Sequence, residues 1–97
     1  MYGTVARLRI KPGSLDQIAA LSREYDDLKI PGHLTTYAIQ MDANANECML
    51  VAVFASKDAY LANANSPEQH ARYTRMRELL ERDPDWHDGQ VVHAYTA

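Results

Sequence analysis

A regular alternation of apolar and polar residues opens the chain and predicts a β-strand over residues 2–11. Ala6, Leu8 and Ile10 occupy one face of this strand, and Arg7 and Arg9 occupy the other. The alternation ends at a Lys-Pro-Gly-Ser sequence, which is typical of a turn because Pro and Gly interrupt regular structure. The first strand is therefore expected to place one apolar face against a core.

Helical spacing follows this turn. Four apolar residues fall on one helical stripe, namely Ile18, Leu21, Tyr25 and Leu28. Ser14 suits the N-cap position, and the Pro31-Gly32 pair ends the helix. The pattern predicts one amphipathic helix between the first and second strands.

A second helical region is broken in two. Ser56 caps a short helix over residues 57–65, and Ser66 begins another, with Pro67 at its first position and Gln69 in the capping-box position. This last helix is predicted to run to about residue 82. Its apolar stripe consists of Tyr73, Met76, Leu79 and Leu80. Its outer side carries Glu and Arg residues four apart, a spacing typical of a solvated helix face.

Three further strands are predicted, over residues 33–41, 47–55 and 90–96, with a hairpin loop at residues 42–46 between the first two. The resulting order is βαββαβ, which is the ferredoxin-like split βαβ arrangement. We therefore expect an α+β fold in one domain over residues 1–97. It has a four-stranded antiparallel sheet, with both helical regions on one face.

The strand over residues 47–55 is apolar on both of its faces. Cys48, Leu50, Ala52 and Phe54 alternate with Met49, Val51, Val53 and Ala55. An antiparallel sheet with one wet face should instead alternate apolar and polar residues. The helices can cover only one face, and a contiguous exposed apolar patch marks an interaction site. A homodimer through the sheet face is the expected solution, because closed two-fold dimers are the commonest homo-oligomers.

The sequence Asp-Pro-Asp-Trp-His-Asp-Gly at residues 83–89 combines carboxylates, an imidazole and the only tryptophan. Pro84 ends the preceding helix, and Asp and Gly residues favour turns. We expect a turn rather than a metal site, because the spacing matches no Ca²⁺-binding loop. His87 is then an exposed turn residue, and Trp86 is expected to fill the base of the core or the dimer contact.

Composition excludes several classes of function. The 97 residues include 10 Lys and Arg against 13 Asp and Glu, a net charge of −3 that argues against nucleic-acid binding. One cysteine allows neither an internal disulfide nor a thiolate zinc site. No apolar run is long enough to span a membrane, and the N-terminus lacks the apolar core of a signal peptide. A cytoplasmic location is the expectation.

The element order, the expected dimer and the Phe-Ala-Ser-Lys-Asp-Ala-Tyr passage from Phe54 resemble the antibiotic biosynthesis monooxygenase (ABM) family, whose fold is the dimeric α+β barrel. Residues 60–89 resemble small ABM-like bacterial proteins, so the resemblance covers nearly the whole chain. It implies a monooxygenase that binds an aromatic or polyketide-like apolar substrate between sheet and helices. It also implies no metal or organic cofactor, since deprotonation of the substrate primes its reaction with oxygen.

Polyketide-oxidising members place a Trp at the end of the third strand, a Tyr six residues later and an Asn four residues before the Trp. By this resemblance Phe54 takes the Trp place, Tyr60 retains the Tyr and Leu50 replaces the Asn. One polar group of that mechanism is therefore missing here.

The haem-degrading branch of the superfamily uses an Asn, a Trp and an axial His. These positions fall on Ala6, Asn63 and Tyr73, none of which matches, although His70 lies three residues from the ligand position. Haem binding is therefore not expected.

Three residues are candidates for catalysis: Tyr60, His33 and His70. A histidine can act as a base near neutral pH; for His33 the alternative is a surface residue at a strand end. The expected substrate-binding residues are Tyr37, Phe54, Leu50, Tyr73, Tyr25 and Asn63. Either Tyr37 or Thr36 lines the cavity, because the sequence leaves open which face of the second strand points inward. Tyr25 and Tyr73 could instead be core residues whose hydroxyls find a partner.

Two functions follow. The first is a cofactor-independent monooxygenase in which Tyr60, with His33, Tyr37 or His70, holds or deprotonates the substrate. The alternative is a non-catalytic dimeric module that binds a small apolar ligand or has a structural role. A cavity beside Tyr60 with converging polar groups favours the first, and a filled or purely apolar space favours the second.

Overall fold

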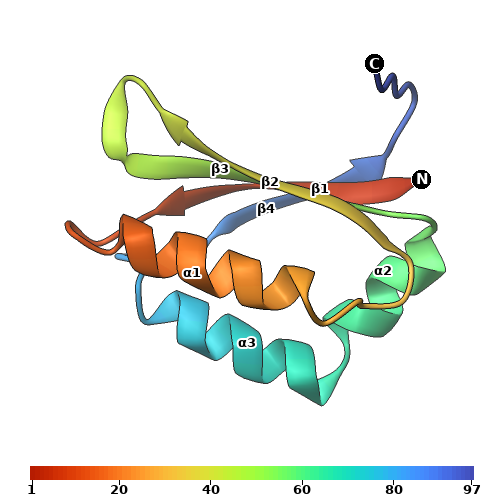
Figure 1. Ribbon diagram of the computed structural model, residues 1–97, viewed down its shortest axis with the longest axis horizontal. Helices are drawn as coiled ribbons and strands as arrows, with labels where there is room; N and C mark the ends of the chain where they lie inside the picture. The colour runs from red at the N-terminus through yellow and green to blue at the C-terminus, as the bar shows by residue number, and fades with distance from the viewer.

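Four antiparallel strands form one sheet in the order β2-β3-β1-β4, and three helices lie on one side of it (Figure 1). The computed structural model describes residues 1–97. The elements are β1 (Tyr2–Arg9), α1 (Leu15–Asp26), β2 (His33–Met41), β3 (Asn44–Phe54), α2 (Lys57–Ala64), α3 (Pro67–Arg77) and β4 (Asp85–Gln90). The predicted α+β ferredoxin-like fold, with its second helix broken in two, is confirmed. None of the three helices has the length and hydrophobicity that a membrane-spanning helix requires.

The core lies between the sheet and the helices, and β1 shows how the sequence builds it. Burial alternates along β1, so Ala6 and Leu8 are buried while Val5 and Arg7 are exposed. This is the period of two that the sequence predicts. The buried cluster consists of Ala6, Leu8, Ile10, Ile18, Leu21, Cys48, Met76 and Leu80.

Serine caps define the starts of α2 and α3. The Ser56 hydroxyl accepts a hydrogen bond from the backbone of Ala59, and the Ser66 hydroxyl accepts one from Gln69, both at 3.1 Å. Ser14 precedes α1 as predicted but makes no side-chain cap. The last helix ends at Arg77 rather than near residue 82. It ends early because the following residues pair with the end of β1, through a bridge between Ile10 and the fully buried Leu80.

The prediction of a turn at residues 83–89 and a strand at residues 90–96 is wrong. The fourth strand is β4, Asp85–Gln90, which pairs with β1 so that Trp86 lies opposite Ala6 and Asp88 opposite Thr4. Its Asp and Gly residues have low β-propensity, but pairing with β1 overrides that preference, and an edge strand tolerates polar side chains. His87 is exposed as expected, but in a strand. Residues 91–97, here called the C-terminal tail, form no regular structure.

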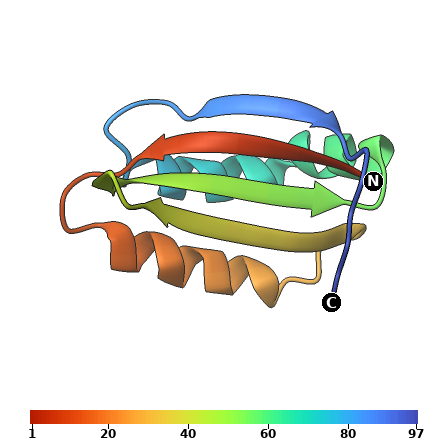
Figure 2. The same ribbon diagram turned by 90° about the horizontal axis from the view of Figure 1, so that it is seen from above.

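One face of the sheet has no helix over it, as Figures 1 and 2 show. Strand register places six apolar residues on this open face: Val5, Met49, Val51, Val53, Tyr37 and Ile39. Tyr37 is 61% exposed and Ile39 is 50% exposed. The expectation that a single chain leaves one apolar sheet face uncovered is therefore confirmed.

Two glycines with positive φ offer a test of the junction between β2 and α2. Gly32 has φ +78°, and a Cβ added there would lie 2.6 Å from the Cβ of Ala59, whereas Gly13 has φ +83° and open space around it. We expect Gly13→Ala to lower the free energy of unfolding by about 1 kcal/mol, the cost of the left-handed conformation. Gly32→Ala should lower it by about 3 kcal/mol, because overpacking adds to that cost. Urea denaturation measures both, and equal losses would contradict the proposed contact with α2.

Candidate functional site

The clearest polar contact on the helix side of the sheet joins α2 to β4. The Tyr60 hydroxyl donates a hydrogen bond of 2.9 Å to Oδ1 of Asp88. Thr4 is buried beside them, directly opposite Asp88 in the β1–β4 register, and its hydroxyl donates to the backbone carbonyl of His87 at 3.3 Å. Three elements therefore bring a phenol, a carboxylate and a hydroxyl together at one end of the sheet.

Aromatic rings surround Tyr60. The Tyr60 ring lies 5.3 Å from that of Tyr2 and 5.6 Å from that of Phe54, centroid to centroid. Phe54 is buried at the end of β3, and its ring also lies 5.2 Å from that of His33. Such tilted and edge-on arrangements are the favoured geometry of aromatic pairs. The four rings form a continuous row from β2 through β3 and α2 to β1.

The environment of Tyr60 keeps its hydroxyl protonated. Burial and the hydrogen bond to Asp88 raise the pKa of Tyr60 to about 12, while Thr4 offsets part of that rise. Desolvation disfavours the charged phenolate, and donation to a carboxylate stabilises the neutral phenol. At neutral pH Tyr60 is therefore a hydrogen-bond donor, and Asp88 is the acceptor of that hydrogen bond.

His33 stands at the other end of the aromatic row, at the edge of an open groove. Its Nε2 lies 2.6 Å from the hydroxyl oxygen of Thr36. The groove has a volume of about 600 Å³ and is lined by residues 29–36 together with Asp26. A second hollow of about 230 Å³ lies over β1, β3 and β4. Tyr60 lines neither of these two hollows.

Two predicted substrate-binding residues belong to a polar network between the helices. Arg72 donates to Oδ1 of Asn63 and to Oε1 of Gln69, each at 3.2 Å. The Tyr25 hydroxyl donates to the backbone carbonyl of Arg72 at 2.9 Å, and the guanidinium lies over the Tyr25 ring. Burial raises the pKa of Tyr25, so this phenol is also neutral. The network ties α1, α2 and α3 together, which agrees with Tyr25 as a core residue with a satisfied hydroxyl.

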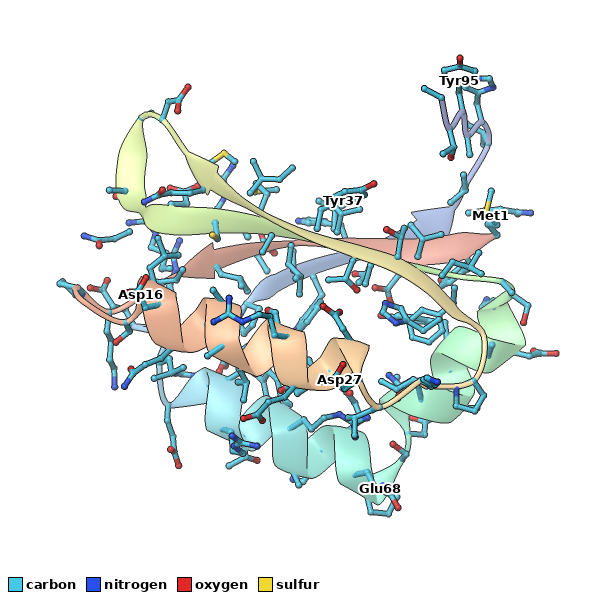
Figure 3. All side chains as sticks on the ribbon, in the orientation of Figure 1. Met1, Asp16, Asp27, Tyr37, Glu68 and Tyr95 are labelled. Atoms are coloured by element: carbon cyan, nitrogen blue, oxygen red, sulfur yellow. The ribbon has the colours of Figure 1, made fainter.

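The remaining predicted site residues lie elsewhere. Tyr37 points away from the helices (Figure 3), so it does not line a space between sheet and helices; Thr36 lies on the helix side instead. His70 is exposed on α3, and no hydrogen bond or ring contact joins it to Tyr60 or His33. Leu50 packs against the core cluster.

Tyr73 also packs against the core cluster, and its ring lies 6.5 Å from that of Trp86. Trp86 itself is exposed. It therefore does not fill the base of the core within one chain.

The acidic residues near β4 diverge rather than converge. Asp83 accepts from Arg77 at 2.6 Å, Asp85 pairs with His87 at 3.2 Å, and Asp88 accepts from Tyr60. No group of three metal-ligating side chains forms anywhere in the chain.

Sequence reasoning missed Asp88, Thr4 and Tyr2 as members of this cluster. Thr4 could have been placed, because it shares the buried face of the first strand with Ala6 and Leu8. Asp88 could not, since its side of the sheet depends on recognising β4 as a strand.

Comparison with known proteins identifies the family. The sequence model described as antibiotic biosynthesis monooxygenase matches residues 1–75, which include Tyr60 and His33 but not Asp88. A crystal structure from Chloroflexus aurantiacus, provisionally named an antibiotic biosynthesis monooxygenase, has a TM-score of 0.81 at 21% identity, over 98% of this chain and 96% of that one. A Deinococcus radiodurans protein with the same provisional name gives a TM-score of 0.80 at 10% identity, over 100% and 98%. A conserved Methanosarcina mazei protein gives 0.79 at 14%, over 92% and 90%. No curated protein matches the chain.

Proposed function

Because the chain belongs to the antibiotic biosynthesis monooxygenase family, we propose that it is a small oxygenase that acts on an aromatic or polyketide-like phenol beside Tyr60 and Asp88. The single observation that carries this proposal is the 2.9 Å hydrogen bond from the Tyr60 phenol to the Asp88 carboxylate inside a row of aromatic rings. The pair offers a proton acceptor next to surfaces that bind flat apolar rings.

Each residue then has a distinct task. Asp88 accepts the proton of the substrate hydroxyl. The single O–H of Tyr60 then turns from Asp88 to donate a hydrogen bond to the substrate oxygen that becomes negative. Tyr2 and Phe54 contact the substrate ring. The electron-rich phenolate supplies the electrons for its reaction with oxygen: one oxygen atom becomes a quinone carbonyl, and the other leaves as water with the two displaced hydrogens. In this scheme no metal or organic cofactor is needed.

His33 gives the site a second candidate base. It shares the aromatic row through Phe54 and stands in the wall of the 600 Å³ groove, which is open to solvent. A substrate that enters by this groove meets His33 first. We assign His33 to binding at the entrance and Asp88 to proton transfer, because Asp88 is the one of these two residues that is hydrogen-bonded to Tyr60.

A non-catalytic binding module is the second candidate function. The observation in its favour is that Tyr60 lines neither the groove at β2 nor the hollow over β1, β3 and β4. A protein of this kind would hold a small apolar or aromatic ligand in the groove and leave it unchanged.

In either case we propose a homodimer through the open face. ABM-family proteins are generally dimeric. The open face carries large apolar side chains, including Tyr37 and Ile39, whose exposure to water is unfavourable. On the same face the Nε of Arg9 is buried without a hydrogen-bond partner, which a carbonyl of a second copy could supply.

Oxygen uptake with a panel of hydroquinones and naphthols tests the catalytic proposal. We expect uptake with at least one compound. The rate should be about 10-fold lower in Tyr60→Phe, because phenylalanine cannot donate the hydrogen bond to the substrate oxygen, which is worth about 1–1.5 kcal/mol. Tyr95→Phe, which changes an exposed tyrosine of the tail, is the matched control and should keep the full rate. Absence of uptake with every compound would favour the binding module instead.

A further inference from the structure

Two glycines face each other across the sheet and leave a hollow on the open face. Gly3 of β1 and Gly89 of β4 are opposite each other in the strand register. The hollow of about 230 Å³ lies over them, and its lining includes the open-face side chains of Val5, Val51 and Val53. No helix contributes to this lining. The hollow therefore opens toward the uncovered side of the sheet rather than toward the core.

The two glycines keep the hollow open for different reasons. A Cβ added at Gly3 would lie 2.5 Å from the carbonyl oxygen of Ala52, so a side chain there would require the sheet to shift. A Cβ added at Gly89 meets no atom within 4 Å, and this glycine does not have the positive φ of Gly13 and Gly32. Its own chain therefore does not require a glycine at position 89, although glycine weakens a strand. A glycine that leaves space for a group from outside the chain accounts for this residue.

The largest apolar side chain of the open face lies at the opposite edge of the sheet. Tyr37 of the edge strand β2 is 61% exposed and points away from the helices (Figure 3). In the register it shares a row across the sheet with Val51, Val5 and His87, and Gly89 lies two residues beyond His87 on β4. The ring and the hollow therefore lie at opposite edges of one face, at nearly the same level along the strands.

We propose that Tyr37 of one copy fills the hollow over Gly3 and Gly89 of a second copy. This inference rests on the proposed dimer through the open face. A two-fold axis that runs between two packed sheets and parallel to the strands places β2 of each copy over β4 of the other, because it reverses the strand order β2-β3-β1-β4. Such an interface is self-complementary, so each ring meets the hollow of the other copy. Sheets pack about 10 Å apart, and side chains of the two inner faces interdigitate.

The hollow fits a tyrosine ring in size and chemistry. An apolar cavity of about 150 Å³ holds a benzene molecule, so a hollow of about 230 Å³ has room for one phenol ring. Its valine side chains offer apolar contact, and the ring can approach the backbone of the two glycines closely because no Cβ intervenes. Tyrosine is also enriched among the few interface residues that carry most of the binding energy. In the dimer the Tyr37 ring thus gains the burial that it lacks in one chain.

Two substitutions change the two sides of this contact, and light scattering over a dilution series measures the dissociation of the dimer in each. Tyr37→Ala removes the ring, and Gly89→Leu fills the hollow with a side chain for which its own chain leaves space. We expect each to weaken the dimer about 100-fold, about 10-fold for each of the two symmetric contacts. Leu61→Ala removes an apolar side chain that is 40% exposed on α2, and it should leave the dimer unchanged. Thermal unfolding shows that each variant is folded.

The double variant decides whether the two residues meet. If the ring occupies the hollow, the Gly89→Leu protein has already lost the contact, and Tyr37→Ala should weaken its dimer no further. Independent effects would instead multiply to about 10⁴-fold and would refute the proposal. A Gly89→Leu protein that dimerises as tightly as the parent would also refute it, since the hollow would then hold solvent or a small apolar ligand. Coupling of Gly89→Leu to Tyr95→Ala, rather than to Tyr37→Ala, would place the C-terminal tail in the hollow instead.

Failure of this inference is distinguishable from failure of the proposed function. A full chain that is a monomer refutes the dimer and the inference together. A dimer that Val51→Lys dissociates, but in which Tyr37 and Gly89 act independently, refutes only the contact between those two residues. None of these measurements uses oxygen uptake, so their outcome holds whether or not the protein is an oxygenase.

Discussion

Val51→Lys is expected to convert the protein from the proposed dimer to an 11.0 kDa monomer at micromolar concentration. Val51 lies at the centre of the open face, opposite Val5 on one neighbouring strand and Tyr37 on the other. In the proposed dimer an ammonium group at this position loses its hydration and gains no partner. An uncompensated charge buried in an interface costs about 3–5 kcal/mol. The dimer should therefore be weaker by a factor of about 100 or more.

Ala20→Lys is the matched control, because it adds the same charge at an exposed position of α1, on the other side of the molecule. It should leave the dimer unchanged. Light scattering at several protein concentrations measures both variants, and thermal unfolding confirms that each is folded. A Val51→Lys protein that dimerises as tightly as the parent would show that the two copies meet elsewhere, or that the open face stays in water.

Local patterns predicted most of the fold because they report on interactions between residues close in the sequence. The alternation in residues 2–11 marks β1, and the serines at positions 56 and 66 mark the starts of α2 and α3. The double apolar face of β3 predicted the open face. β4 was missed because Asp85–Gln90 carries almost no strand-forming residues, and its pairing with β1 is a tertiary interaction.

The same distinction explains the candidate site. Tyr60, Phe54 and His33, which the sequence analysis names as candidate site residues, lie in one aromatic row. The sequence left open whether Tyr37 or Thr36 faces inward, and β2 carries a register irregularity between His33 and Thr35. That irregularity puts His33 and Thr36 on the helix side and turns Tyr37 outward, and a bulge of this kind leaves no clear signal in a single sequence.

Asp88→Asn should abolish most of the proposed oxygenase activity while leaving the site intact. Asparagine has the same shape as aspartate and keeps an oxygen that can accept the Tyr60 hydroxyl. It cannot take the substrate proton. Loss of a positioned general base lowers kcat by about 10²–10⁴-fold, whereas binding of the phenol should change little because the aromatic surfaces remain. Steady-state kinetics with any substrate found by oxygen uptake separates the two effects.

Asp85→Asn is the matched control on the same strand. Asp85 lies on the opposite side of β4 and pairs with His87, so its loss should leave kcat unchanged. An independent readout needs no substrate. Asp88 contributes to the rise in the pKa of Tyr60 to about 12, so ultraviolet titration of Asp88→Asn should show Tyr60 ionising at lower pH than in the parent protein. If Asp88→Asn shifts the Tyr60 titration but retains the full kcat, then the contact exists and Asp88 is not the base. In that case His33 is the remaining candidate base of the aromatic row.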